Sequence, residues 1–347
     1  MEKAFVTMPA KPRENNTGSI IATSVSDYLG DVFDAKKILT VNLLHTYKNS
    51  EQYLDSYFED IKNTGNRYDI LLRDIDYVNK VLDLIRDMID IGIVKTGSEK
   101  IIRCDCGRVE LSRNGIRKKN NASIYKVDGN KVICNCCQGE CKEYDEKILY
   151  IPIEDEKITE INVIPNILSK CVNGKNKEMS GTRFIISKNR NTGYTVNHND
   201  VDYNIDVDFI WMNIFRFIDA ENKYLVCSNK QSLKVFYINY LYSIYKKDKM
   251  DFILHPIINN ISDQFYESED SLRKKLSILF SMSWNRESCQ FNNSVYSYLS
   301  KMSSTELQQL YEKMCNVLKD NNPNCEKSKR IEYVLKNGTN FNYLTKK

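Results

Sequence analysis

The stretch that decides the fold is AFVTMPAKPRENNTGSIIATSVSDYLGDVFDAKKILTVNLL, which spans residues 4–44. An apolar run is followed by a polar segment with Thr17 and Gly18, a helical pattern up to Phe33 and a second apolar run. This order predicts a βαβ unit with parallel strands and a ligand crevice at their carboxyl ends. Because the N–H groups at a helix start favour phosphate, the turn at Gly18 is a candidate nucleotide-binding site.

The rest of the chain reads as α/β material. Apolar side chains at helical spacing predict two helices, within residues 53–61 and 78–89. RFIISKNRNTGYTVN predicts a strand that ends in a basic loop, and DFIWMN predicts a strand that carries Trp211. KYLVCSNKQSLKVFYINYLYSIY predicts a strand and a helix, and the pattern is helical from about residue 268.

Four parts are expected along the chain. They are the first half of a nucleotide-binding domain at 1–65, a connecting insertion at 66–180 with a cysteine ribbon at about 98–150, the second half of the domain at 181–265, and a C-terminal helical region at 266–347.

Composition excludes some classes of function. Of the 347 residues, 41% are hydrophobic and 28% charged, which is typical of a folded protein. The net charge of +4 is too small to favour nucleic-acid binding by bulk electrostatics, and the basic run at 113–121 is typical of a solvated loop. No apolar run approaches the roughly 20 residues of a membrane span, and the first residues lack a signal-peptide core. We therefore expect a cytoplasmic protein without a membrane partner.

Six of the eleven cysteines gather in two short knuckles. These are RCDCGRV, with Cys104 and Cys106, and VICNCCQGEC, with Cys134, Cys136, Cys137 and Cys141. In an intracellular chain this spacing is typical of a metal site rather than of disulfides. A tight turn at each knuckle directs two thiolates at one point, and two knuckles supply the four ligands of tetrahedral zinc.

We expect the ligands to be Cys104, Cys106, Cys134 and Cys137, with Cys136 or Cys141 as alternatives. The flanking strands EKIIRC and VDGNKVIC predict a hairpin-like ribbon with little core of its own, so that zinc would serve as its core. A site of four thiolates has no open coordination position and is therefore structural. The competing interpretation is a set of free buried thiols.

The order of these parts resembles the class I aminoacyl-tRNA synthetases, closest to the methionyl branch. TMPAKPRENNTGSI is similar to the family's first strand and loop up to its signature, and LGDVF to the helix after it. RYDILLRDIDYVNKVLDLIRDMIDIGIV is similar to the segment before the zinc knuckles, and RFIISKNRNTGYTVN with the Trp211 strand to the second half. The resemblance covers about residues 4–320 and implies a Rossmann-like catalytic domain with a zinc-ribbon insertion and a C-terminal helical region.

Such enzymes bind ATP with Mg²⁺ and an amino acid, form an aminoacyl adenylate and pass the acyl group to tRNA. Histidines of the family's HIGH signature stabilise the phosphate charge that develops in the transition state. In the registers considered, that signature falls within Ile20, Ile21, Ala22, Thr23 and Ser24, without a histidine. Hydroxyl groups stabilise phosphate charge less than imidazoles do, and the loss of such a donor lowers rates by about 10²- to 10³-fold.

The family's KMSKS loop has a similar run here, Lys301 to Ser304, but its position argues against a catalytic role. The matching helix, EDSLRKKL, comes earlier, so that the loop should fall within 255–269, where there is no lysine. Ser303 and Glu306 have the spacing of a capping box, which predicts a helix start instead.

Further site residues follow from the resemblance and from loops at predicted strand ends. The nucleotide-binding candidates are Gly18, Thr23, Ser24 and Lys230, and the amino-acid-binding candidates are Lys11, His45, Trp211 and Asn213. The same loops contain Arg13, Lys188, Arg190 and Asn229. The alternative for the charged groups is a solvated loop position, and for Trp211 a core position.

Three functions are compatible with these patterns. The first is a synthetase-like protein with an amino-acid and ATP crevice, altered or lost adenylate formation and no anticodon-binding domain, because few residues follow position 320. The second is an active ATP-dependent amino-acid-activating ligase with substituted donors. The third is a zinc-ribbon binding scaffold. The expected partners are an amino acid and a nucleotide, with tRNA or an RNA end as a further candidate.

Overall fold

The structure is a computed structural model that describes most of the first 255 residues and parts of the remainder. The described residues are 2–12, 17–44, 50–111, 125–164, 168–187, 194–228, 231–245, 250–255, 274–275, 298–299 and 301–320. Several predicted residues lie outside these ranges, namely Arg13, His45, Lys188, Arg190, Asn229 and Lys230. The same holds for most of the segment 255–269.

The chain forms two compact units, each built from separate stretches. Unit 1 comprises Met1–Asp76, Lys157–Met179 and Arg216–Lys347. Unit 2 comprises Tyr77–Glu156 and Ser180–Phe215. Single-turn helices cross three of the four boundaries: η2 (Asp74–Tyr77), η3 (Asp155–Lys157) and η5 (Ile214–Phe217). The four-part division expected from the sequence stays a prediction.

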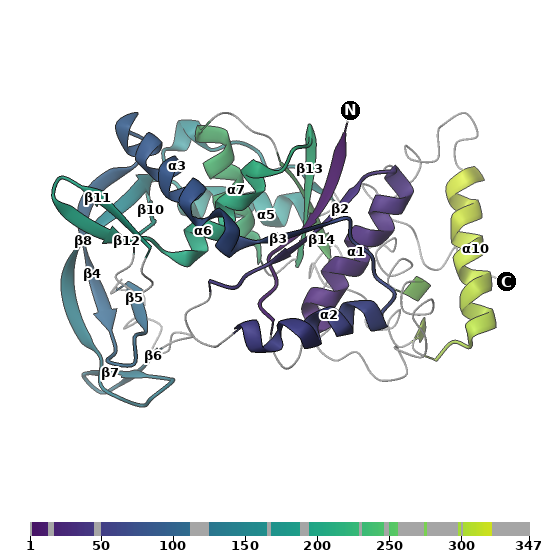
Figure 1. Ribbon diagram of the computed structural model, residues 1–347, viewed down its shortest axis with the longest axis horizontal. Helices are drawn as coiled ribbons and strands as arrows, with labels where there is room; N and C mark the ends of the chain where they lie inside the picture. Colours follow the sequence, from purple (N-terminus) through teal and green to yellow (C-terminus); the bar gives the residue numbers. More distant parts are fainter. Residues whose placement is uncertain are drawn as a thin grey trace. The chain divides into compact units, whose positions relative to one another are not determined.

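Unit 1 is built on a parallel sheet, whose strands and helices are visible in Figure 1. Its elements are β1 (Lys3–Thr7), α1 (Thr17–Phe33), β2 (Lys36–Val41), η1 (Ser50–Tyr53), α2 (Leu54–Asn63), β3 (Ile70–Arg73), β9 (Val163–Ile164), α5 (Ser169–Met179), β13 (Asn222–Ser228), α7 (Ser232–Ile244), β14 (Asp251–His255) and α10 (Ser304–Asp320). The strand order is β3-β2-β1-β13-β14-β9, and all five pairings are parallel. The predicted βαβ start is confirmed.

The sheet reverses its strand order beside β1. From β1 the chain continues outward through α1 to β2 on one side, and from β13 through α7 to β14 on the other. Right-handed crossovers in opposite directions place α1 and α7 on opposite faces. The carboxyl ends of β1 and β13 therefore form a topological switch point, the place where open α/β sheets bind ligands.

Helices α1 and α2 dock on the sheet by different contacts. The Ser26 hydroxyl of α1 donates to the Phe5 carbonyl of β1 at 3.1 Å. From α2, Tyr57 and Ile61 pack against Leu39 and Val41 of β2. Tyr57 and Ile61 are among the apolar positions whose helical spacing predicted a helix within residues 53–61.

A buried group of charges joins α1 to β2. The Lys37 ammonium group, 8% exposed as a residue, donates to Asp27 at 2.8 Å and to Asp31 at 2.5 Å. Burial lowers the pKa of Lys37, but its hydrogen bonds to both carboxylates outweigh that effect and raise the pKa overall. Gly30 allows this approach, because a Cβ there would lie 2.4 Å from Lys37 Cγ.

The helix predicted after the KMSKS-like run is α10, and its start has the predicted capping box. The Ser303 backbone N–H and hydroxyl donate to Glu306 Oε2 at 2.9 and 2.7 Å, and the Glu306 N–H donates to the Ser303 hydroxyl at 3.4 Å. These bonds lower the pKa of Glu306. The letters around Lys301 are thus explained by a helix start.

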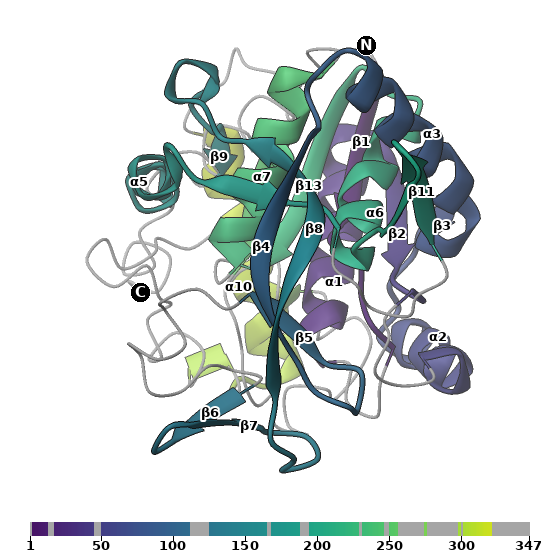
Figure 2. The same cartoon turned by 90° about the vertical axis from the view of Figure 1, so that its left-hand side faces the viewer.

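Unit 2 is mainly antiparallel. Its elements are α3 (Val78–Asp90), β4 (Lys95–Arg103), β5 (Val109–Leu111), β6 (Tyr125–Asp128), β7 (Lys131–Cys134), β8 (Lys142–Pro152), β10 (Arg183–Ile185), β11 (Thr195–His198), β12 (Val201–Asn204) and α6 (Val207–Asn213). A four-stranded sheet has the order β10-β8-β4-β5, and β6-β7 and β11-β12 are hairpins. Figure 2 shows β4 and β8 as a long ribbon with the β6-β7 hairpin near one end.

Two sequence-based expectations for unit 2 are wrong. The strand EKIIRC does not pair with VDGNKVIC: β4 pairs with β5 and β8, whereas VDGNKVIC belongs to the separate β6-β7 hairpin. The residues around Trp211 form a helix, α6, instead of a strand. Asp206 caps that helix by accepting from the Asp208 N–H at 3.1 Å. A continuous apolar run does not distinguish a buried strand from a buried helix, and here the cap decides.

Within the described ranges, no helix is long and apolar enough to cross a membrane. The expectation of a cytoplasmic protein stays a prediction.

Candidate functional site

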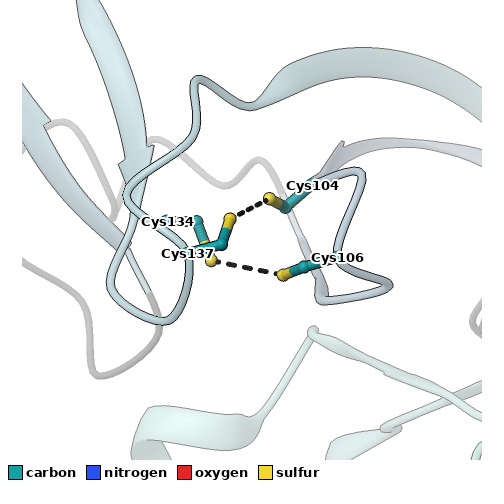
Figure 3. Close-up of side chains that lie close together, drawn as sticks. All are labelled: Cys104, Cys106, Cys134 and Cys137. Carbon is teal, nitrogen blue, oxygen red and sulfur yellow. Dashed lines mark hydrogen bonds between the residues drawn. The ribbon is translucent and has the colours of Figure 1, made fainter.

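Two places in the structure gather residues with chemical potential, and the first is the cysteine cluster of unit 2. Single sulfur atoms of Cys104, Cys106, Cys134 and Cys137 all lie within 4.8 Å of one another. Figure 3 shows the two thiols of one knuckle facing the two thiols of the other. Across this gap Cys104 lies 3.2 Å from Cys137, and Cys106 lies 3.6 Å from Cys134.

Backbone turns hold these thiols in place. In the first knuckle the Gly107 N–H donates to the Cys104 carbonyl at 2.9 Å, and Gly107 has a φ of +85°, which L side chains rarely adopt. In the second knuckle the Gln138 N–H donates to the Cys134 carbonyl at 3.0 Å. N–H groups also point at sulfur, from Cys136 to Cys134 and from Gly139 to Cys137, both at 3.4 Å.

The cluster fits a four-coordinate zinc ion. Zinc bound to four sulfurs at about 2.3 Å would place those sulfurs about 3.8 Å apart, within the range of separations seen here. A disulfide would need about 2.05 Å, well below them. Among the described residues, this is the one group of His, Cys, Asp or Glu side chains close enough to hold a metal ion.

The electrostatics of the four thiols differ. Burial raises the pKa of Cys104 to about 11 and that of Cys106 to about 12. Burial also acts to raise the pKa of Cys134, but N–H groups of Cys137 and Cys136 and neighbouring thiols outweigh it and lower the value to about 7. Without a metal these contacts favour a thiolate at Cys134, and a divalent cation would supply the charge that stabilises thiolates at Cys104 and Cys106.

The two alternative ligands lie beside the cluster. Cys136 is exposed, and Cys141 is half-buried and packs against Cys104 and Cys134. Ile102, Tyr125 and Val132 complete the small apolar core around these thiols. The small core around the thiols is as predicted, although the predicted pairing of EKIIRC with VDGNKVIC is wrong.

The second place is the edge of the parallel sheet in unit 1 where its strands end. Polar side chains stand at or just beyond five of these ends: Thr7 on β1, Asn42 after β2, Asp74 after β3, Ser228 on β13 and His255 on β14. All but Ser228 are nearly fully buried. Ser228 and His255 are neighbours in the register of β13 and β14.

Asp74 holds the backbone beyond β2. Its carboxylate accepts from the Leu43 N–H at 2.7 Å and from the Leu44 N–H at 3.5 Å. Burial raises the pKa of Asp74 to about 6, although these backbone bonds act in the opposite direction. The carboxylate therefore fixes the segment that leads to His45.

The predicted residues of unit 1 have different fates at this edge. Lys11 is half-buried and follows Ala10, which bridges Val41 beside the end of β2. Gly18 lies in the first turn of α1, which begins at Thr17. Thr23 and Ser24 are 2% exposed and lie deeper in α1, together with the buried Ile20, Ile21 and Ala22. The helix start at Gly18, and not these hydroxyls, is the part of α1 nearest the strand ends.

Trp211 and Asn213 belong to unit 2 and are buried there. The Trp211 indole N–H donates to Asp208 at 2.9 Å, and the Asn213 side chain donates to the Phe209 carbonyl at 2.8 Å. Both contacts are local to α6. Their role in binding an amino acid stays a prediction.

None of the five polar residues at the strand-end edge was found from sequence: Thr7, Asn42, Asp74, Ser228 and His255. A parallel sheet gathers strand ends that are remote in sequence, and single-sequence patterns do not give the strand order. For His255 the sequence does offer a signal, because the run DFILH has four residues of strand character followed by a histidine.

No family model matches the sequence, and no curated protein matches it. Solved structures do match the fold. The crystal structure of Mycobacterium tuberculosis methionyl-tRNA synthetase bound by methionyl-adenylate is similar with a TM-score of 0.57 at 11% identity, over 92% of this chain and 72% of that chain. A second complex with methionyl-adenylate gives 0.57 at 11% over 93% and 73%, and the apo form gives 0.56 at 13% over 92% and 70%.

The chain therefore has the fold of a class I aminoacyl-tRNA synthetase. Within that class, its fold is near that of the methionyl-tRNA synthetases, over most of its length. At this level of identity the likeness establishes the fold alone.

Proposed function

We propose that this protein binds an amino acid and a nucleotide at the carboxyl ends of its parallel strands, and that its adenylate-forming activity is altered or lost. The observation that carries the proposal is the switch point between β1 and β13, in a fold that matches structures holding methionyl-adenylate. The start of α1 at Thr17 supplies backbone N–H groups at this end of the sheet, which suits a phosphate.

The proposed loss of activity follows from the donors of α1. Ile20 to Ser24 contain no histidine, and the two hydroxyls among them are buried. A nucleotide at the helix start would meet backbone N–H groups without an imidazole from this segment. By the precedent of oxyanion-hole donors, this lowers the rate of adenylate formation by about 10²- to 10³-fold for each missing donor.

One observation favours an active enzyme with substituted donors. His255 ends β14 at the same edge of the sheet as the start of α1, and it is 3% exposed. An imidazole there has the chemistry of the missing signature histidines. Lys11 adds a cation near the end of β2.

ATP–pyrophosphate exchange with each of the twenty amino acids separates these alternatives. The proposal expects no exchange above background, together with a thermal shift by ATP or by one amino acid. Robust exchange with any amino acid would establish the ligase. Silence in both assays would contradict the crevice itself and leave the zinc ribbon as the functional part.

A matched pair of histidine variants sharpens the test. H255Q removes the imidazole at the strand-end edge, whereas H198Q changes a histidine that contacts Asn199 in the β11-β12 hairpin of unit 2. For H255Q, the ligand affinity measured by thermal shift should fall at least tenfold, and so should the exchange rate if the wild type shows exchange. For H198Q, both should stay unchanged. Equal behaviour of the two variants would remove His255 from the site.

Structural zinc at the four cysteines and an RNA partner belong to the same proposal. Elemental analysis of protein purified without chelator should give one zinc per chain, and less than half an equivalent would contradict it. For RNA, we expect an acceptor-stem minihelix to bind as well as whole tRNA, because we propose recognition of an RNA end. Binding of whole tRNA alone would contradict that part.

A further inference from the structure

The four thiols of the metal centre form two pairs that each join one knuckle to the other. Cys104 faces Cys137, and Cys106 faces Cys134, at the distances given above. In each pair one thiol is buried and the other exposed: Cys104 and Cys134 are buried, whereas Cys106 and Cys137 are exposed. Figure 3 shows both pairs spanning the same gap.

This arrangement suits a two-step oxidation. Peroxides react with accessible thiolates, and the sulfenic acid that results condenses with a thiol in contact with it. Here each accessible sulfur has a shielded sulfur as its contact partner. Closing a disulfide from 3.2 or 3.6 Å to about 2.05 Å requires a movement of only about 1 to 1.6 Å in each pair.

We propose that the metal centre is a peroxide-sensitive switch, in which oxidation closes the cross-knuckle disulfides Cys104–Cys137 and Cys106–Cys134 and releases the metal. The inference rests on metal binding at these cysteines and is independent of whether the chain forms adenylate.

The chemistry balances for each pair. The exposed thiol gives its proton to solvent and its sulfur attacks hydrogen peroxide: an S–O bond forms, the O–O bond breaks and hydroxide leaves. The sulfur of the buried partner then attacks the sulfenic sulfur, so that an S–S bond forms, the S–O bond breaks and a second hydroxide leaves. Two thiolates are oxidised and one peroxide is reduced by two electrons, with the two hydroxides protonated by solvent. Disulfide sulfurs carry no negative charge, and the metal loses two of its four ligands at the first closure.

The geometry also specifies which thiols stay reduced. Cys136 is exposed and contacts the Cys134 sulfur through its backbone N–H, at 3.4 Å. Cys141 packs beside Cys104 and Cys134, and its thiol donates to the Gly139 carbonyl at 3.8 Å. Accessibility alone would make Cys136 an early target. Pairing across the gap predicts instead that both end up outside the disulfides.

Titration of the purified, metal-loaded protein with hydrogen peroxide tests this. A chromogenic chelator measures metal release, and peptide mass spectrometry after thiol blocking assigns the disulfides. We expect one metal ion released per chain, both cross-knuckle disulfides, and full reversal by dithiothreitol with added zinc. Retention of the metal through thiol oxidation, or disulfides that contain Cys136 or Cys141, would overturn the proposal.

Two variants keep the test decisive. C136S changes an exposed neighbour outside the pairs and should release metal at the wild-type rate with the same disulfides. C137S should form only Cys106–Cys134, a pattern that can be read even if this variant binds metal weakly. A Cys104–Cys106 or Cys104–Cys134 disulfide in C137S would contradict the pairing.

Discussion

The parallel sheet and the cysteine ribbon organise their chemical groups by different forces. At the strand ends of the sheet, Thr7, Asn42 and His255 follow strands whose apolar residues are almost wholly buried. In the ribbon, the apolar core consists of Ile102, Tyr125 and Val132 beside the thiols themselves. The sheet thus places its polar groups by burying apolar area, whereas the two cysteine knuckles have little apolar area to bury.

This difference indicates in which region a bound ligand contributes to the stability of the fold. The strand-end groups are positioned by strand pairing and packing before any ligand arrives, so that a ligand there adds to a fold that already exists. The thiols sit on two separate turns, and we expect a bound metal to hold these turns together. We therefore expect a change in one region to leave the stability of the other unaffected.

The largest expected effect is that of metal removal. A structural zinc contributes about 10 kcal/mol or more in small zinc domains. Chelation should therefore abolish hydrogen-exchange protection in the first knuckle and in peptides from the β6-β7 hairpin and the second knuckle, residues 125–141, and leave that of β1 and β13 intact. C171S changes an exposed cysteine of α5 outside the cluster and should keep its zinc. Loss of protection in the sheet after chelation would show that the two regions are not independent.

The converse break is Lys37→Met in the sheet region. It leaves the fully buried Asp27 without its 2.8 Å partner, and breaking a buried ion pair in this way costs about 3–5 kcal/mol. Arg67, 3.6 Å from Asp27, offsets part of that loss. Urea unfolding monitored in the sheet should show the decrease, with zinc content unchanged.

Lys36→Met is the matched control for this change. Lys36 pairs with Glu2 at the surface, and exposed pairs contribute little to stability. A similar loss of stability for both variants would mean that the buried ion pair of Lys37 stabilises the sheet region no more than a surface pair does.

A smaller effect in the sheet depends on pH and comes from Asp74. Its pKa is raised from 3.8 to about 6. Between these two pH values the carboxyl group is protonated in the native state and ionised in the unfolded chain. The stability contributed by this group is therefore present below about pH 4 and lost as pH rises towards 6, by about 2–3 kcal/mol. D74N lacks this titration.

Urea unfolding at pH 4.5 and 7.5 measures the effect as a difference between variants. The stability of D74N relative to wild type should rise with pH by most of that amount. D76N alters an exposed carboxylate that pairs with Arg73, and it should show no such trend. A pH-independent difference for D74N would contradict the raised pKa.

The smallest expected effect is in the ribbon, at Gly107. Its φ of +85° is unfavourable for an L side chain by about 1–2 kcal/mol, while nothing lies within 4 Å of an added Cβ. G107A should therefore weaken zinc binding by about 5- to 30-fold in a chelator competition, without a change in urea unfolding of the sheet. G107N should recover part of the affinity, because asparagine tolerates positive φ.

Local patterns predicted much of this fold from sequence. The βαβ start, the helices α2 and α3, the strand and helix at β13 and α7, and the capping box of α10 all depend on periodicity or on residues a few positions apart. The cysteine cluster was predictable for the same reason, because two knuckles each carry their own turn. Its four residues are those expected, with Cys136 and Cys141 beside it.

What sequence did not predict is either non-local or ambiguous in period. The pairing of β4 with β8 and the gathering of Asp74 and His255 at one edge depend on strand order, which a single sequence does not display. The segment around Trp211 is apolar at nearly every position, so that its helical state depends on the cap from Asp206. Thr23 and Ser24 follow the order of a family signature, but they face the interior.

The pairing of β1 with β13 also has a consequence for synthesis of the chain. Lys3 is in register with Asn222, and all of unit 2 is translated between them. Until the ribosome has released β13, the buried edge of β1 has no partner strand, while the cysteine ribbon is already complete and able to take up its metal. Contacts this remote in sequence make folding slow. The nascent chain thus leaves one edge of its central strand unpaired until β13 is made, while β2 can already pair with the other edge, and shortage of zinc or of chaperones would affect the two regions at different times.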